Sequence, residues 1–256
     1  LKRGRELFEL GRWADAKEEF AAACRAVPPL EASLRTEADY YAAMCAMEMK
    51  EAGAAARLAD FLRQHPGSVH ANDVEFALAS LACTAGRYDD AQRAFDKVDY
   101  GSLSSKHREQ YDIRMGYIRF QQGDYDGASH YFRRIPSQSE YAEHALYYIA
   151  YIAYVRGDNA TAKAAFTQLT RSAAYGVVAP FYLLQIEFNA GNYRYVVTTG
   201  GELIDRAAGD RRTELERVVA EAWFHLGDYG RSEEFMNAYR RDGGAMGRNE
   251  NYILWY

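Results

Sequence analysis

The chain has 256 residues, 48% of them hydrophobic, and a formal net charge of −5 with acidic and basic residues mixed along its length. This is enough apolar material for a large core, and the abundant alanine with only five prolines favours an all-α fold. A missing basic surplus argues against a nucleic-acid partner, and no apolar run reaches the roughly 18 residues that a membrane-spanning helix needs.

In chain order, four segments (9–20, 84–95, 121–132 and 155–166) share one frame. A glycine is followed by a bulky or turn residue two positions later, alanine five later and phenylalanine nine later. The four sets are Gly11/Trp13/Ala16/Phe20, Gly86/Tyr88/Ala91/Phe95, Gly123/Tyr125/Ala128/Phe132 and Gly157/Asn159/Ala162/Phe166. Looser copies follow Gly53, with Leu62 in the ninth place, Gly191, with no phenylalanine there, and Gly227, with Phe235 one residue early.

The spacing of these glycines sets a period. They fall at Gly11, Gly53, Gly86, Gly123, Gly157, Gly191 and Gly227, with steps of 42, 33, 37, 34, 34 and 36 residues. The period and the residue set resemble the tetratricopeptide repeat, a helix–turn–helix unit of about 34 residues. The resemblance covers essentially the whole chain. It implies a single right-handed α-α superhelix, a solenoid of about seven helix pairs over residues 1–256.

Each position in the frame has a physical role. Glycine suits the turn that ends the first helix, where a positive φ is expected. Alanine lets the two helices approach closely, and phenylalanine fills the gap beside it. Expected N-caps of second helices are Asp124, Asp158, Asn192 and Asp228. Expected capping boxes of first helices are Ser137-x-x-Glu140, Thr36-x-x-Asp39 and Asn72-x-x-Glu75.

The segment ALYYIAYIAY (145–154) is the expected first helix of the pair closed by Gly157. Tyr147, Tyr151 and Tyr154 share one face at helical spacing. A second stripe, made by Leu146, Ile149, Ala150 and Ala153, is expected to supply the buried face.

The family resemblance places binding on the first helices, which line the concave face in proteins of this type. The expected inward positions lie three, six and ten residues before each turn glycine. The candidate groove residues are Tyr117, Phe120, Tyr147, Tyr151, Tyr154, Phe181, Gln185 and Phe188. Two interpretations stay open: the aromatic rings bind a partner, or they pack on one another and close the inner wall.

No catalytic or metal-binding pattern is visible. The six histidines lack a second ligand at metal spacing, and Cys24, Cys45 and Cys83 match no zinc or redox motif and are interpreted as small buried residues. We therefore predict a non-enzymatic protein-interaction scaffold that needs no cofactor and holds a peptide or a helix.

Two other functions stay open. One is the ligand- or peptide-sensing part of a longer cytoplasmic signalling protein; the other, less favoured, is a carbohydrate-binding or enzymatic repeat protein. The sequence also resembles long bacterial repeat proteins, which implies a role in the periplasm or cell envelope.

Both ends of the sequence look cut, since it begins at Leu1 and ends inside an apolar helical stretch. Ile253, Leu254 and Trp255 would then begin a further repeat with no neighbour to cover them. We expect either end-to-end self-association through these residues or a disordered tail.

Overall fold

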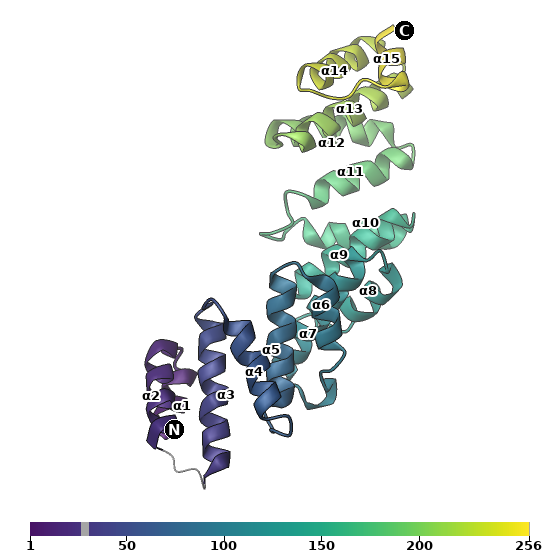
Figure 1. Cartoon of the computed structure of the whole chain (residues 1–256). Coiled ribbons are helices and arrows are strands. Elements are labelled where there is room, and N and C mark those ends of the chain that lie inside the picture. The colour runs from purple at the N-terminus through teal and green to yellow at the C-terminus, as the bar shows by residue number, and fades with distance from the viewer. Residues whose placement is uncertain (27–30, 256) are drawn as a thin grey trace. The chain divides into compact units, whose positions relative to one another are not determined.

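The computed structural model describes residues 1–26 and 31–255, and within that range every regular element is helical (Figure 1). The predicted all-α fold of consecutive helix pairs is confirmed. The chain divides into two compact units, Leu1–Pro136 and Ser137–Tyr256. One continuous solenoid over the whole chain stays a prediction.

The first unit holds four helix pairs. Its elements are α1 (Lys2–Glu9), α2 (Trp13–Ala26), α3 (Ala32–Glu48), α4 (Ala54–Gln64), α5 (Ala71–Thr84), α6 (Tyr88–Phe95), the 3₁₀ turn η1 (Tyr100–Ser102), α7 (Ser105–Gln121) and α8 (Tyr125–Phe132). First helices of successive pairs also contact one another, α1 with α3, α3 with α5 and α5 with α7.

The second unit holds three pairs and one further helix. Its elements are α9 (Ala142–Val155), α10 (Asn159–Leu169), α11 (Ala179–Asn189), α12 (Tyr193–Arg206), α13 (Asp210–His225), α14 (Tyr229–Arg241) and α15 (Arg248–Trp255). Helix α15 packs on both α13 and α14 and so takes the place of the next first helix.

Six of the seven predicted turn glycines end a first helix as expected. Their φ values are positive, between 71° and 79°. At Gly86, for example, the glycine amide donates to the carbonyl of Cys83 and the next amide donates to that of Ala82, which satisfies the last carbonyls of α5.

The second repeat differs from the others at its turn. Lys50 has φ 54° and occupies the place held elsewhere by glycine, because its amide and that of Glu51 bond back to Met47 and Ala46. Gly53 comes three residues later and forms the N-cap of α4. With Lys50 as the turn residue, the first two steps become 39 and 36 residues instead of 42 and 33, so aligning this repeat on Gly53 shifts it by three positions.

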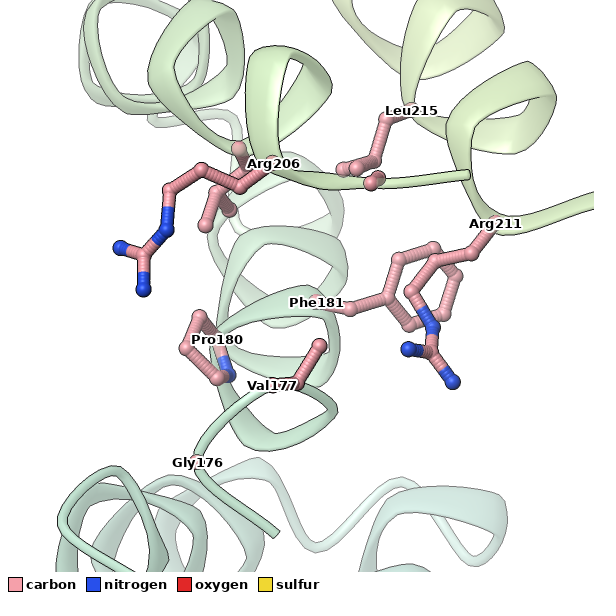
Figure 2. Close-up of a pocket in the computed structure, with 9 residues that line it drawn as sticks. Gly176, Val177, Pro180, Phe181, Arg206, Arg211 and Leu215 are labelled. Atoms are coloured by element: carbon pink, nitrogen blue, oxygen red, sulfur yellow. The ribbon is translucent and has the colours of Figure 1, made fainter. Parts of the chain in front are cut away.

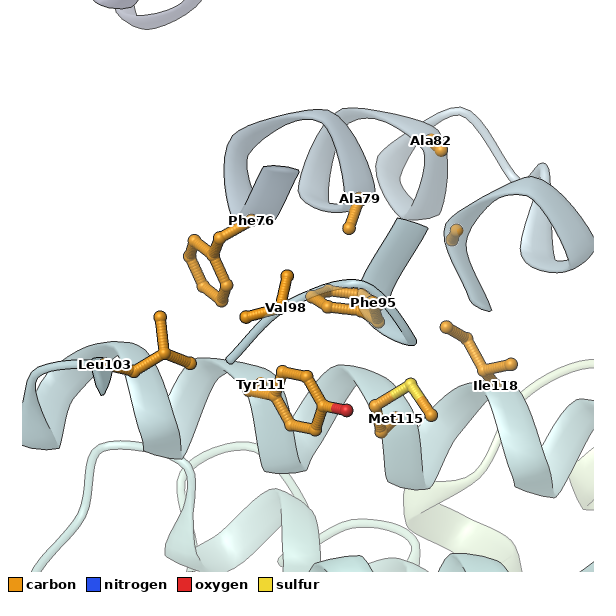
Figure 3. Close-up of a cluster of buried hydrophobic side chains, with 10 residues drawn as sticks. Phe76, Ala79, Ala82, Phe95, Val98, Leu103, Tyr111, Met115 and Ile118 are labelled. Carbon is orange, nitrogen blue, oxygen red and sulfur yellow. The ribbon is translucent and has the colours of Figure 1, made fainter. Parts of the chain in front are cut away.

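A small residue seven positions before the turn glycine packs against the phenylalanine nine positions after it. The buried pairs are Gly4 with Phe20, Ala79 with Phe95, Gly116 with Phe132 and Ala150 with Phe166. Figure 3 shows Ala79 and Phe95 within the core between α5, α6 and α7. A methyl group on Gly116 would lie 2.5 Å from the Phe132 ring, so the helices meet at van der Waals distance.

In the repeat around Gly191, the large residue lies on the first helix and the small residue on the second, the reverse of the other repeats. Leu184 takes the place of the small residue and is fully buried, while Gly200 takes the place of phenylalanine. A Cβ on Gly200 would lie 3.6 Å from Leu184 Cδ2. The missing phenylalanine in this copy is therefore compensated on the facing helix.

In two looser copies, the large buried residue of the second helix is not the one predicted. Met236, and not Phe235, is the fully buried residue of α14, while Phe235 is half-buried. In α4, Phe61 is buried and Leu62 is only partly covered, because α4 begins immediately after Gly53.

Three of the four predicted N-caps form. Asp124, Asp158 and Asp228 each accept a hydrogen bond from a first-turn amide, at 2.9–3.1 Å. Asn192 occupies the N-cap position of α12 as predicted, but its side chain makes no capping hydrogen bond and its amide donates to the Glu187 carboxylate instead.

The three capping boxes are also wrong. Helices α3 and α5 begin upstream of Thr36 and Asn72, at Ala32 and Ala71, and α9 begins five residues after Ser137. Asn72 instead exchanges two hydrogen bonds with the backbone of Asp99. It thereby fastens the start of α5 to the connection that follows α6.

The expectation of an uncovered C-terminal segment is wrong for Ile253. That side chain is buried against Ala220, Met236 and Tyr239, with Leu254 partly buried at the edge of the cluster. The Trp255 side chain lies outside the described residues. Self-association through this end stays a prediction.

Candidate functional site

Tyr147, Tyr151 and Tyr154 line one side of α9 and are half-buried. All three approach Tyr182 of α11, with ring centroids 6.4, 5.9 and 5.4 Å away. Tyr182 itself stacks on Phe166 at 4.6 Å. We call the four tyrosines, Tyr147, Tyr151, Tyr154 and Tyr182, the tyrosine face.

The tyrosine face rests on the core of its own repeat. Leu146, Ala150 and Ala153 belong to the same hydrophobic cluster, as the second stripe predicted, while Ile149 stays half-buried and Ile152 is buried outside that stripe. The rings are thus partly filled by their neighbours and partly exposed to solvent. Each ring therefore packs on its neighbours with one part of its surface and leaves another part exposed for a partner, so the two interpretations of the tyrosines are compatible.

Burial disfavours ionisation of three hydroxyl groups in this region, those of Tyr154, Tyr175 and Tyr182. Burial raises the pKa of Tyr175, which stacks on Tyr147 at 4.6 Å, to about 12. Burial, together with a hydrogen bond to Tyr147, raises the pKa of Tyr182 further, and burial also raises that of Tyr154. These groups can exchange hydrogen bonds with a ligand but are poor nucleophiles at neutral pH.

Helix α11 contributes three of the predicted residues. The ring of Phe188 lies 5.5 Å from Tyr193 and 6.2 Å from His225. Gln185 is only 8% exposed, and its Nε2 donates to Glu214 Oε1 at 3.3 Å. Gln185 is therefore the least accessible of the predicted residues.

Helix α13 carries charged side chains at two of the inward positions counted back from Gly227, Glu221 and Arg217. The Arg217 guanidinium donates to Glu214 Oε2 at 3.0 Å and also binds Glu221. Burial raises the pKa of Glu221 despite this partner, and the bond to Glu214 raises that of Arg217. Two carboxylates around one guanidinium leave one negative charge beside the aromatic rings.

Tyr117 and Phe120 belong to the first unit, on α7. Tyr117 meets Tyr88 edge-on at 5.6 Å, and Phe120 meets Tyr125 at 5.6 Å. The same ring pair across the turn recurs as Phe188 with Tyr193 and as Phe224 with Tyr229, at 5.3–5.5 Å. The position three before the glycine therefore joins its own turn through an aromatic contact.

Phe181 meets the Tyr182 ring edge-on at 5.5 Å and also forms part of the wall of a small cavity of about 60 Å³ (Figure 2). The cavity lies between the start of α11, the end of α12 and the start of α13. We call it the arginine pocket; its lining residues are Gly176, Val177, Pro180, Phe181, Leu203, Arg206, Ala207, Arg211 and Leu215. The sequence signal that could have located it is the connection RAAGDRR, at 206–212.

Comparison with known families decides what the repeats are. Residues 37–68 and 113–177 each match a family model described as tetratricopeptide repeat. The chain therefore contains tetratricopeptide repeats. No curated protein sequence matches it.

Solved structures share the tetratricopeptide-repeat fold. A tetratricopeptide-repeat protein from Parabacteroides merdae is 14% identical with a TM-score of 0.51, over 99% of this chain and 95% of that one. The Cut9–Hcn1 hetero-tetramer of the APC/C matches with 12% identity and a TM-score of 0.51, over 93% of this chain and 45% of that one. At this identity the likeness concerns the fold alone.

The three cysteines of the chain are poorly suited to nucleophilic chemistry. Burial raises the pKa of Cys45 to about 11, and that of Cys24 and Cys83 as well, so the thiolate form is disfavoured. Within residues 1–26 and 31–255, no three His, Cys, Asp or Glu side chains are grouped to hold a metal ion. In the same range, no helix combines the length and the apolar run needed to cross a bilayer.

Proposed function

We propose that the Ser137–Tyr256 unit binds a peptide or a helix of a partner protein across the tyrosine face, and that this binding is non-catalytic. The observation that carries the proposal is the arrangement of Tyr147, Tyr151 and Tyr154. Their rings are held in place by Tyr182, yet each keeps part of its surface in solvent.

Such rings suit recognition. A tyrosine that is already ordered loses little conformational freedom on binding, and it offers both apolar area and a hydroxyl group. The neighbouring Glu214, Arg217 and Glu221 supply polar groups next to the aromatic area, an arrangement typical of binding sites with an apolar centre and a polar rim.

The test uses random linear peptides displayed on phage and selected on the whole chain. The selected peptides are then measured by fluorescence anisotropy against wild type and the Tyr151→Ala/Tyr154→Ala variant. We expect binding to weaken about tenfold or more, as for truncation of central aromatic contacts. The melting temperature should fall only moderately, since both rings pack on Tyr182 but are only half-buried. Tyr147 is left intact because it also packs on Phe166 and Tyr175.

The matched control is Tyr195→Ala/Tyr229→Ala, which removes two tyrosines that are 48% and 43% exposed. This variant should bind the peptides like wild type. The proposal fails if the Tyr151/Tyr154 variant melts much lower but binds the selected peptides unchanged.

A role in bacterial envelope assembly stays a prediction from the sequence resemblance. Export of the full-length gene product to the periplasm would support it, and retention in the cytoplasm would favour the sensor alternative.

A further inference from the structure

The arginine pocket combines an apolar floor with a cationic rim. Val177, Pro180, Phe181 and Leu215 provide apolar walls, and Val177 is 61% exposed at the mouth. Figure 2 shows Arg206 and Arg211 on opposite sides of this mouth, each reaching away from its own helix end.

In the part of the chain that the structure describes, no carboxylate forms an ion pair with Arg206 or Arg211, although Glu202, Asp205 and Asp210 are close in sequence. This contrasts with the next arginine along α13, Arg212, which pairs with both Glu216 and Asp242.

From this arrangement we infer that the arginine pocket binds an acidic peptide segment of a partner protein. One apolar side chain of the peptide enters the cavity, and carboxylates on either side of it contact Arg206 and Arg211. Charge complementarity decides the class of ligand, since two cations flank the mouth and guanidinium groups pair with carboxylates in two-point geometry. The cavity volume suits a single aliphatic side chain, since an engineered apolar cavity of about 150 Å³ accommodates a whole benzene molecule. This inference rests on the proposed function in taking the unit as a peptide-binding scaffold, but it uses different side chains.

The test uses a fluorescein-labelled peptide, Gly-Glu-Glu-Leu-Glu-Glu-Gly, titrated with the whole chain and followed by anisotropy. Two companion peptides separate the contributions, one with serine in place of leucine and one with lysine in place of each glutamate. We expect binding of the first peptide only, with an affinity that falls as salt is raised.

The deciding variant is Arg206→Gln/Arg211→Gln. It should weaken binding of the acidic peptide about tenfold or more, because charge-assisted hydrogen bonds are lost. The matched control, Arg194→Gln/Arg240→Gln, removes the same charge from two exposed arginines outside the pocket and should bind like wild type. Val177→Ser, at an exposed position, tests the apolar part without disturbing the core.

Three outcomes overturn the inference: no binding of the acidic peptide, equal loss in both arginine variants, or a dimer in light scattering that the Arg206/Arg211 variant abolishes. The last outcome would assign the pocket to a second copy of the chain. The Tyr151→Ala/Tyr154→Ala variant distinguishes the two proposals. If it binds the acidic peptide normally while losing the phage-selected peptides, both proposals stand. If only the Arg206→Gln/Arg211→Gln variant has an effect, the pocket stands without the tyrosine face.

Discussion

Single residues with unusual backbone conformations define the repeat frame. Glycine supplies the positive φ at the turns at no steric cost, and this is why counting glycines located most pairs correctly. Lys50 escaped the count because it adopts the same conformation with a side chain attached. The residue type gives no sign that a lysine adopts a left-handed conformation, so the repeat was aligned on the nearby Gly53 instead.

Replacing Lys50 with glycine should therefore stabilise the chain. An L-residue in the left-handed region costs about 1–2 kcal/mol, and the greater freedom of glycine in the unfolded chain offsets part of the gain, so we expect a net increase of about 0.5–1 kcal/mol. The midpoint of urea denaturation measures it. Lys50→Ala removes the same exposed side chain but keeps the strained φ, and should stay near wild type. Equal stabilisation by both substitutions would contradict the argument.

At the scale of the helix pair, close packing determines which glycines tolerate a side chain. Gly200 and Gly201 are neighbours in α12, but a Cβ on Gly200 would lie 2.3 Å from Val219 Cγ2, whereas one on Gly201 meets nothing within 4 Å. Two glycines of equal helix propensity thus have opposite environments.

We predict opposite effects for the two alanine substitutions. Gly201→Ala should raise the free energy of unfolding by about 0.5–1 kcal/mol, the usual gain in a helix interior. Gly200→Ala should lower it by about 1–3 kcal/mol, since overpacking outweighs that gain. Thermal melts of both variants measure this. Adding Val219→Ala to Gly200→Ala should recover part of the loss, and a stabilised Gly200→Ala would show that α12 and α13 are not in close contact there.

The helix ends explain why sequence predicted the second helices better than the first. The aspartates that follow the turn glycine cap second helices through short-range bonds, as at Asp158. First helices α3, α5 and α9 begin without any side-chain cap, so packing and not a local motif sets their start. The candidate site, too, could be predicted from the sequence only where a local pattern marks it. Helical spacing predicted the tyrosines of α9, whereas the arginine pocket joins three helix ends, and the local sequence at 206–212 marks only two of them, the end of α12 and the start of α13.

At the scale of the whole molecule, each compact unit carries its own core clusters. Those of Ser137–Tyr256 lie around Phe166, around Leu184 with Val218 and around Met236. A stack needs about three repeats for stability, and this unit has three helix pairs with α15 packed on the last.

The segment 137–256 should accordingly fold when expressed alone. We expect a strongly α-helical circular dichroism spectrum and a cooperative thermal transition. The whole chain, measured in the same buffer, provides the reference signal. A disordered spectrum for the segment would mean that its clusters depend on residues before Ser137.

The size exchange between Leu184 and Gly200 also restricts how helices of this chain can be recombined. An α11-type helix set beside a second helix with phenylalanine would bring two large side chains to one place and cost about 1–3 kcal/mol of overpacking. An α9-type helix set beside α12 would instead leave a void between alanine and glycine. The repeats of this chain resemble one another, so a first helix could pair with the wrong second helix during folding. The size mismatch disfavours such pairs and so favours the pairing of α11 with α12. For the same reason, exchanging a single helix between repeats should destabilise the protein, and helices should be exchanged as pairs.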